Sequence, residues 1–521
     1  MRLHDFLDYY ANNYPDGDFA VQGQRRVSYR EALAEVHQLS NAFAAAIIGP
    51  GDRVALLSKN SIEYAICYYA ASKSGVVPVP MNYRLAPPEW AYIINDSGSK
   101  MVIASAEYVE GIDTIRGGLQ SVGHFVAVGD STKSGWTGYG SLIGGQPATA
   151  QSHDVNSTDD LLQMYTSGTT GRPKGTVLTH NNVCENIQQC SPTLNMERGD
   201  QFLIVAPMYH VAAGFCTFLT VSRGGCLYIQ EDFNPTEVVR ALSEENIAST
   251  LLVPAMIQAC LVAVPDVAER RYDNLRSLTY GASPIAEGTL RRAMEVFKCD
   301  FIQAFGMTEL SPVATFLTPD DHRRALEEKP ELLLSAGKPI LGTEARIVDE
   351  DDNPVPNGTM GELLIRGPQV MKGYWNLPEE TAEALRGGWM HTGDAGTMDD
   401  EGYIYIQDRV KDMILSGGEN VYPRVVEDVL FKHPAVADAA VIGVPDEQWG
   451  ETVKAVVVLR DGQSATGEEI IEFCRSHLGG FELPRSVEPV PALPRNASGK
   501  VLKRELREPF WEGQGRRVAG S

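Results

Sequence analysis

The 521-residue chain has an ordinary globular composition and a strong negative charge. Hydrophobic residues make up 43% and charged residues 22%, which excludes a disordered or collagen-like chain. The 45 Lys and Arg against 68 Asp and Glu give a formal charge of −23, which repels nucleic acid and anionic membrane surfaces. We therefore expect no nucleic-acid partner, and local groups must hold any anionic ligand.

The eight cysteines predict a reducing compartment. None forms a Cys-x-x-Cys pair, and most stand in apolar surroundings, so we expect buried free thiols. Residues 1–5 carry an early acid without a long apolar core, so no signal peptide is evident. Apolar stretches such as residues 202–207 are too short to span a bilayer. We expect a cytoplasmic protein with no membrane span.

The first 150 residues predict alternating helices and strands. Apolar spacing predicts a helix over residues 29–47 with Ser28 as its N-cap, followed by a buried strand at residues 54–57. A second helix is predicted over residues 61–72. This rhythm is typical of an α/β fold with parallel sheets covered by helices. It recurs at residues 201–205, 225–230, 235–244, 249–253 and 275–280.

The alternation of helices and strands gives way to short predicted strands at about residue 337. Short strands at residues 345–348, 361–366 and 402–406, separated by Asp, Asn, Pro and Gly, predict a small β-rich unit. We place a domain boundary at residues 408–412, because another αβ unit follows. Its predicted elements are a helix near residues 425–432, strands at residues 437–444 and 452–459, and a helix at residues 467–477.

The strongest chemical signal is Thr-Ser-Gly-Thr-Thr-Gly-Arg-Pro-Lys-Gly at residues 166–175, after an apolar strand at residues 161–165. The glycines allow close backbone approach and present N–H groups to an anion, the hydroxyls add donors, and Lys174 adds a charge. That chemistry suits a polyphosphate. The spacing differs from a Walker loop, since Pro173 and Thr176 stand five residues after Gly168 and Gly171, where that pattern has its second glycine. Taken alone, a loop of this composition would be a flexible surface loop.

The whole string resembles the signature loop of the adenylate-forming superfamily, which includes acyl-CoA synthetases, luciferases and the adenylation domains of peptide synthetases. Further motifs follow in the family's order as far as Lys500. The resemblance implies an α/β N-terminal domain over residues 1–408, with its β-rich subdomain at about 337–408. It also implies a hinge at residues 409–411 and a small mobile α+β domain over residues 412–521. ATP, Mg²⁺ and coenzyme A are the implied cofactors.

Residues 303–309, Gln-Ala-Phe-Gly-Met-Thr-Glu, resemble the family's second core motif. The resemblance implies Glu309 as a Mg²⁺ ligand and Thr308 as an α-phosphate contact, and a hard cation takes carboxylate oxygen. Phe305 stands where tyrosine is common, so it keeps a face for adenine but lacks the hydroxyl. Alone, Thr308 and Glu309 could simply cap a helix start. The implied ATP-site residues are Thr166 (also catalytic and a metal ligand), Ser167, Gly168, Thr169, Thr170, Gly171, Lys174, Gly281, Ala282, Ser283, Gln303, Ala304, Phe305, Gly306, Met307 and Thr308.

Two segments resemble the walls of the acyl site. Tyr-Gly-Ala-Ser-Pro at residues 280–284 resembles the strand end that lines both the adenine and the acyl pockets, and residues 207–214 resemble the start of the acyl site. A lone histidine such as His210 is more often a satisfied core residue than a functional one. Its position in the family motif makes a substrate contact as plausible as a purely structural role. His210 is therefore a catalytic candidate, but we do not assign it as a general base. The implied substrate-binding residues are Tyr209, His210, Gly214, Ser283, Gly306 and Met307.

Asp394 follows a glycine turn and resembles the residue that accepts both ribose hydroxyls. A carboxylate can hold a vicinal diol bidentately, although an Asp in this setting can also cap a turn. Residues 408–412 resemble the family's hinge. There Arg409 is implied to reach the ribose and phosphate side, and Lys411 to be the residue whose backbone torsion changes.

The C-terminal region supplies the remaining candidates. The resemblance implies that Ser416, Gly417 and Gly418 swing toward the active site for the thioester step. Trp449 resembles a residue near the coenzyme A nucleotide, and its alternative is to pack the small domain. Lys500 is the best catalytic candidate, because a cation between a carboxylate and an α-phosphate offsets their repulsion.

These motifs favour an ATP-dependent carboxylate–CoA ligase that forms acyl-adenylate and pyrophosphate, then acyl-CoA and AMP. The alternative is a ligase that delivers the acyl group to a carrier protein. An amino-acid activator would place an acid within residues 208–210, a luciferase needs the same adenylation, and a non-catalytic protein would be expected to lose Glu309, Asp394 or Lys500. The apolar residues 211–215 favour a medium- or long-chain fatty acid or an aryl acid as the carboxylic acid substrate. A homodimer is a candidate assembly.

Overall fold

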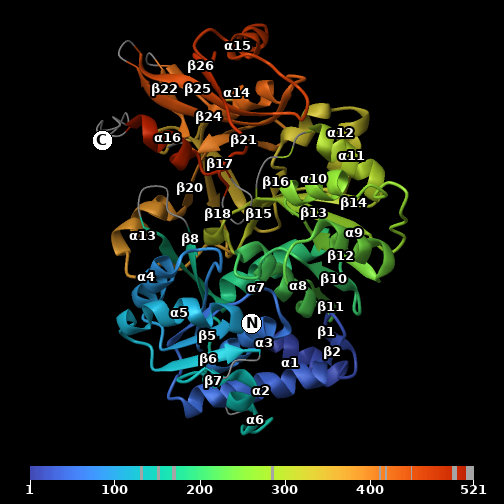
Figure 1. The fold of residues 1–521 in the computed structure, drawn as a ribbon, viewed down its shortest axis with the longest axis vertical. Coiled ribbons are helices and arrows are strands. Elements are labelled where there is room, and N and C mark those ends of the chain that lie inside the picture. The colour runs from blue at the N-terminus through green and yellow to red at the C-terminus, as the bar shows by residue number, and fades with distance from the viewer. Residues whose placement is uncertain are drawn as a thin grey trace. The chain divides into compact units, whose positions relative to one another are not determined.

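The computed structural model describes most of the chain, in two units (Figure 1). The first unit comprises residues 1–330, 339–344 and 366–385, and the second comprises residues 331–338, 345–365 and 386–521. The two-residue strand β16 (Lys338–Pro339) falls at a division between them. The described residues are 1–129, 133–149, 153–166, 172–282, 285, 287–409, 412–416, 419–446, 449–495 and 501–511.

Two largely parallel sheets dominate the first unit, as the sequence predicts. In one, β3 (Arg53–Leu57) lies between β4 (Val77–Pro80) and β5 (Met101–Ser105), and β6 (His124–Val128) and β7 (Thr137–Gly138) follow β5. The other runs in the order β15-β14-β13-β12-β10-β11-β1-β2 and is parallel from β14 to β1. Its strands are β1 (Asp18–Gln22), β2 (Arg25–Ser28), β10 (Gln201–Ile204), β11 (Cys226–Ile229), β12 (Ile247–Leu251), β13 (Ser277–Gly281), β14 (Asp300–Gly306) and β15 (Val313–Leu317).

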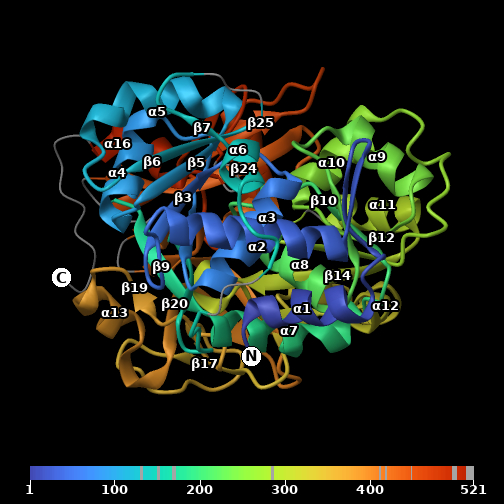
Figure 2. The same ribbon diagram turned by 90° about the horizontal axis from the view of Figure 1, so that it is seen from below.

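The helix α2 (Tyr29–Ala45) begins after the predicted cap Ser28, and α3 (Ile62–Ser74) begins one residue later than predicted, with Ser61 as its cap. The Ser28 hydroxyl accepts a hydrogen bond from the Glu31 N–H, and Ser61 does the same for Tyr64. The two helices lie side by side, and α3 contacts both β1 and β4, so the pair lies between the two sheets (Figure 2). The unit's other α-helices are α1 (Leu3–Asn13), α4 (Pro87–Ser97), α5 (Val109–Ile115), α6 (Tyr139–Gly144), α7 (His180–Leu194), α8 (Val211–Ser222), α9 (Pro235–Glu244), α10 (Pro254–Ala263), α11 (Glu287–Phe297), α12 (Pro319–Glu327) and α13 (Pro378–Ala384).

A smaller sheet carries the glycine-rich loop. The strands β8 (Asp160–Thr166) and β9 (Lys174–Thr179) form an antiparallel hairpin, and β19 (Gly373–Tyr374) pairs with the outer edge of β9. The strand predicted before the loop is therefore confirmed. Residues 167–171 of the motif lie outside the described residues.

The second unit contains two sheets. One has the order β17-β18-β20-β21, with β17 (Glu344–Val348), β18 (Gly361–Arg366), β20 (Met390–Met398) and β21 (Ile404–Arg409). The strand predicted at residues 402–406 corresponds to β21, which begins two residues later than predicted. The other sheet has the order β23-β22-β25-β24, and β26 pairs with β25. Its elements are β22 (Ile414–Ser416), β23 (Glu419–Val421), α14 (Pro423–Leu430), β24 (Val436–Asp446), β25 (Gly450–Leu459), α15 (Gly467–Arg475), β26 (Ser486–Pro489) and α16 (Lys503–Trp511).

The cysteines match the expectation from the sequence. All eight are free thiols, of which seven are buried and Cys299 is half-buried. Over the ranges that the structure describes, we find no helix with the length and apolar character needed to cross a membrane.

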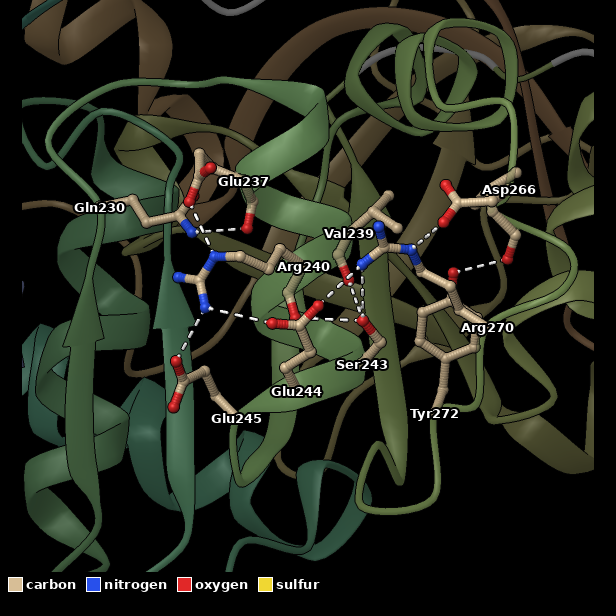
Figure 3. A network of polar contacts seen from close by, with 11 residues as sticks. Gln230, Glu237, Val239, Arg240, Ser243, Glu244, Glu245, Asp266, Arg270 and Tyr272 are labelled. Carbon is tan, nitrogen blue, oxygen red and sulfur yellow. Dashed lines mark hydrogen bonds and ion pairs between the residues drawn. The ribbon is translucent and has the colours of Figure 1, made fainter.

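An ion-pair network covers the surface of α9 (Figure 3). Arg240 donates to Glu237 and Glu245 at 2.9 Å each, and Arg270 donates to Asp266 at 2.9 Å. These pairs are exposed, where each contributes ~0–1 kcal/mol, so the network orders a surface and does not hold the core. None of the residues predicted for the site belongs to it.

Candidate functional site

The predicted adenine and acyl segments meet at the carboxyl ends of neighbouring strands. The strands β13 and β14 are paired in register, with Gly281 opposite Ala304, so residues 280–282 and 303–309 lie next to each other. His210 begins α8 beyond the end of β10, a strand of the same sheet. In open α/β sheets, ligands bind beyond the carboxyl ends of the strands. This edge of the sheet is therefore the candidate ligand site of the first unit.

At two positions on this edge, Gly281 and Gly306, the surrounding backbone leaves no room for a side chain. A Cβ atom at Gly281 would stand 2.1 Å from the Ala304 carbonyl oxygen, and one at Gly306 would stand 1.9 Å from that of Pro312. Ala282 has a φ of 64°, a left-handed conformation that costs a non-glycine residue about 1–2 kcal/mol. Surrounding packing must hold this strained residue in place, so the strand end is rigidly defined.

Gln303 has an unsatisfied polar atom. Its Oε1 is buried and has no hydrogen-bond partner among the residues that the structure describes. Leaving such an atom unpaired costs about 1–3 kcal/mol, and a donor from a ligand would recover that cost. Phe305 is half-buried further along the same strand, opposite Thr315.

Glu309 is a buried carboxylate at the start of a short 3-10 turn, η3 (Thr308–Leu310). Its residue is 5% exposed, and its Oε1 accepts a hydrogen bond from the Tyr374 hydroxyl at 3.0 Å. The turn is preceded by Met307, which makes no side-chain cap. The alternative interpretation is therefore wrong about a Thr308 cap, whereas Glu309 does lie in the first turn of a short helix.

Thr166 and Lys174 stand opposite each other at the end of the β8–β9 hairpin where the chain passes from one strand to the other. They frame residues 167–171, where the predicted phosphate contacts Ser167, Gly168, Thr169, Thr170 and Gly171 lie outside the described residues. The Lys174 Nζ lies 5.0 Å from the ring centroid of Tyr374. The structure thus brings Lys174 and Glu309 to the ring and the hydroxyl of one tyrosine that sequence analysis did not select.

One helix holds both flanks of the loop. The Tyr165 hydroxyl donates to Asp96 of α4 at 2.5 Å, and the Tyr92 hydroxyl of the same helix donates to the Pro173 carbonyl at 3.1 Å. Burial, with Asp96 beside it, raises the pKa of Tyr165, so the phenol remains a donor. Sequence analysis missed these anchors, because the helix and the hairpin are distant in the chain.

A buried arginine, Arg53, forms hydrogen bonds to two residues of the hairpin strand β8. Arg53 donates to Gln163 at 3.0 Å and to Asp160 at 2.8 Å, and its guanidinium lies 3.7 Å from the ring centroid of Trp375. Burial lowers the pKa of Arg53, although Asp160 opposes that shift. Because the Trp375 indole also donates to the Asp96 carbonyl at 3.1 Å, the segment after β19 is tied to α4 as well.

His210 caps α8. Its Nδ1 accepts a hydrogen bond from the Ala212 N–H at 3.4 Å, and burial lowers the pKa of His210, so the ring is neutral. The neighbouring Tyr209 packs edge-on against Tyr83, with ring centroids 5.4 Å apart. Within the described part of the chain, the buried Tyr209 hydroxyl has no hydrogen-bond partner. Gly214 lies one turn further along the helix. A contact between His210 and substrate stays a prediction.

In the second unit, the two ribose candidates occupy paired backbone positions on neighbouring strands. Asp394 on β20 is paired in register with Arg409 on β21, and Asp394 is 6% exposed. The turn before Asp394 is held by Glu362, whose Oε1 accepts the Gly393 N–H at 3.0 Å. Asp394 thus lies within a strand, and its own N–H donates to the Thr392 hydroxyl at 3.1 Å.

The coenzyme A candidates also come together. Ser416 on β22 pairs with Gly450, the residue after Trp449. Trp449 is 42% exposed, so part of its surface is open to a ligand, and its contact with coenzyme A stays a prediction. The other predictions, Ser283, Lys411, Gly417, Gly418 and Lys500, lie outside the described residues.

Comparison with protein families gives two matches. Residues 7–375 match the model of the AMP-binding enzyme family, and residues 425–500 match that of the AMP-binding enzyme C-terminal domain. Together they cover most of the chain, on both sides of residues 409–411.

Similar proteins extend over nearly the whole chain. A fatty acid–acyl-carrier-protein ligase, ScoC, of Streptomyces coeruleorubidus is 35% identical and covers 98% of this chain and 96% of its own. A feruloyl-CoA synthase of Amycolatopsis is 38% identical, with 96% and 97% covered. The crystal structure of the anthranilate CoA ligase AuaEII with anthranoyl-AMP superposes with a TM-score of 0.90 at 26% identity, covering 98% and 97% of the two chains.

Proposed function

Because this chain belongs to the family of AMP-binding enzymes, we propose that it is an AMP-forming carboxylate–CoA ligase. The observation that carries the proposal is the arrangement of Lys174 and buried Glu309 around Tyr374, at the end of the hairpin where the glycine-rich motif joins its two strands. A cation, a carboxylate and a segment rich in N–H and hydroxyl donors form the set of groups that a metal-bound polyphosphate requires.

Each residue would act mainly by positioning the reactants and stabilising charge. Thr166, Lys174 and the donors of residues 167–171 would bind the phosphates of ATP. The strand end at Gly281, Ala282 and Gln303 would hold the adenine, whose amino group is a donor of the kind that the Gln303 Oε1 lacks. Such positioning suits in-line attack by a carboxylate on the α-phosphorus, which needs little covalent help.

The residues present fit a magnesium ion. Glu309 offers a buried carboxylate oxygen and Thr166 a hydroxyl oxygen, which are the ligand types that a hard cation prefers. The ion would neutralise phosphate charge when bound. Lys500 would add a second positive charge between the carboxylate and the α-phosphate.

The thioester step would use the second unit. Asp394 and Arg409 would hold the ribose and phosphate side of the nucleotide. We propose a hinge at residues 409–411, about Lys411, that lets residues 416–418 and Trp449 approach when coenzyme A arrives. The exposed indole of Trp449 supports this assignment, because it offers a face for a nucleotide base.

The acid substrate is proposed to be a medium- or long-chain fatty acid or an aryl acid. The segment that follows His210 is apolar, with Ala213 and Phe215 buried, which suits an apolar acyl group. A carrier protein is the second candidate acceptor, favoured by the similarity to the carrier-protein ligase. A cytoplasmic location and a homodimer stay predictions.

The test is a panel of carboxylic acids of increasing chain length, with aryl acids, incubated with ATP and Mg²⁺. AMP release and the acyl product are measured by mass spectrometry, with coenzyme A or an acyl carrier protein as acceptor. We expect AMP, pyrophosphate and acyl-CoA from one subset of acids. ADP formation, or AMP release that depends on no acid, would contradict the proposal, and acyl transfer to the carrier alone would favour the second candidate.

A further inference from the structure

One tyrosine links two residues that the proposed function requires. The hydroxyl of Tyr374 donates to the Glu309 carboxylate at 3.0 Å, and the Lys174 ammonium lies 5.0 Å from the centroid of its ring. We propose that Tyr374 is a positioning residue that orients Glu309 toward the metal and holds Lys174 toward the phosphates. This inference rests on the proposed function of the same site.

The backbone of Tyr374 is fixed on both sides. Its N–H donates to the Thr381 hydroxyl at 2.9 Å, and the N–H of Trp375 donates to the Gly175 carbonyl at 2.7 Å. The strand β19 is therefore attached to β9 at the residue that follows Lys174. A side chain carried on such a backbone can set the position of its partners.

The approach to Tyr374 is anchored further upstream. The side-chain amide of Asn182 donates to the carbonyls of Pro368 and Val370 at 2.8 and 2.7 Å. The Met371 N–H then donates to the backbone carbonyl of Glu309 at 2.8 Å. Glu309 is thus held twice by one segment, through its backbone by Met371 and through its carboxylate by Tyr374.

The chemistry of the two contacts explains why a tyrosine is needed. A hydroxyl that donates to a carboxylate fixes the rotation of that group and leaves its negative charge in place, whereas an ion pair would neutralise it. The ring face attracts the Lys174 ammonium without accepting its proton. Tyrosine can therefore order a cation and an anion together while both remain charged for ligands.

The two contacts can be separated by substitution. Tyr374→Phe removes the hydroxyl and keeps the ring, so the carboxylate loses its orientation while Lys174 keeps its contact. We expect the affinity for the metal to fall about tenfold, the lower range for a hydrogen bond to a charged group. Tyr374→Leu removes both contacts and should also weaken binding of ATP itself.

The experiment titrates Mn²⁺, as a spectroscopic probe of the Mg²⁺ site, into the full chain with the non-hydrolysable nucleotide α,β-methylene-ATP. Binding is followed by electron paramagnetic resonance, so neither an acid nor turnover is needed. The matched control is Tyr272→Phe, which removes a hydroxyl that donates to the Val267 carbonyl at 2.7 Å, beside the α9 network (Figure 3). Melting temperatures report whether each variant folds.

We expect Tyr374→Phe to bind Mn²⁺ about tenfold more weakly and Tyr272→Phe to bind it like the wild type. In a Glu309→Gln background, Tyr374→Phe should cause no further loss, because it acts through Glu309. Equal affinity in Tyr374→Phe and wild type, or the same loss with and without Glu309, would overturn the inference. Should Tyr374→Phe fail to fold, Thr381→Val, which removes the acceptor of the Tyr374 N–H, should weaken Mn²⁺ binding, and no change would overturn the inference.

This test is separate from that of the proposed function. A chain that binds Mn²⁺ and nucleotide as expected, but releases AMP with no acid in the panel, would contradict the ligase proposal alone. A ligase whose Mn²⁺ affinity ignores Tyr374 would contradict the positioning role alone.

Discussion

Asp394 stands directly opposite Arg409 on the adjacent antiparallel strands β20 and β21. Sequence motifs suggested each residue separately as a contact for the ribose side of a nucleotide. The pairing places a carboxylate, which can accept hydrogen bonds from hydroxyl groups, next to an arginine, a residue type that binds phosphate.

Replacing Asp394 with Asn should weaken ATP binding selectively. An amide has one acceptor oxygen where the carboxylate has two, so it cannot accept from both ribose hydroxyls. We expect the KM for ATP to rise about tenfold, in line with loss of a hydrogen bond to a charged group. The control is Asp438→Asn, which removes a carboxylate from an ion pair with Arg495 in the same unit. An unchanged KM for ATP in Asp394→Asn would exclude the ribose role.

Tyr165→Phe should loosen the glycine-rich loop. The hydroxyl of Tyr165 donates to Asp96 and accepts from the Gln163 amide at 3.0 Å, so its removal leaves two partly buried partners unsatisfied. We expect about 1–3 kcal/mol less stability and a several-fold higher KM for ATP. Urea unfolding and initial rates measure the two effects. Tyr92→Phe, which frees only the Pro173 carbonyl, should be milder; equal effects would mean that Asp96 is not the main anchor.

The difference between local and distant signals explains what sequence could predict here. The start of α2 followed from Ser28, because a cap depends on residues three positions away. The site motifs were also contiguous strings. Tyr374 and Asp96 had no such signal, since their partners are 65 and 69 residues away and only the folded chain joins them.

Acid should destabilise the first unit through two buried histidines. The ring centroids of His4 and His180 lie 6.1 Å apart. Burial lowers the pKa of His4 to about 4 and the pKa of His180 to about 3. Between pH 6.5 and 4 the unfolded chain therefore binds more protons than the folded chain. Their contribution to stability is complete above pH 6.5 and is lost as the pH falls through this window.

The size of this effect can be measured by urea unfolding at pH 7 and pH 5. Each histidine should lower the free energy of unfolding by about 2 kcal/mol at the lower pH. His4→Asn should lower the stability at pH 7, because the Nδ1 contact with Ser72 at 3.0 Å is altered, yet it should flatten the pH dependence. A variant with the same slope as the wild type would show that other groups cause the acid sensitivity.

Lys500→Ala should separate the two half-reactions. If Lys500 offsets repulsion between the carboxylate and the α-phosphate, its loss should lower adenylate formation by ~100-fold or more, the size of an electrostatic contribution to catalysis. Acyl-CoA formation from pre-formed acyl-adenylate should change little, because that step no longer joins two anions. Stopped-flow measurement of each half-reaction tests this, and equal losses in both would contradict the assignment.

The adenylate itself can be detected by isotope transfer. A substrate acid labelled with ¹⁸O in its carboxylate is incubated with the enzyme, ATP, Mg²⁺ and coenzyme A, and the AMP is analysed by mass spectrometry. Attack of the carboxylate on the α-phosphorus and later cleavage of the C–O bond by the thiol must leave one carboxylate oxygen on AMP. We predict a single ¹⁸O in each AMP released. Unlabelled AMP, or label found in free phosphate together with ADP, would contradict the account.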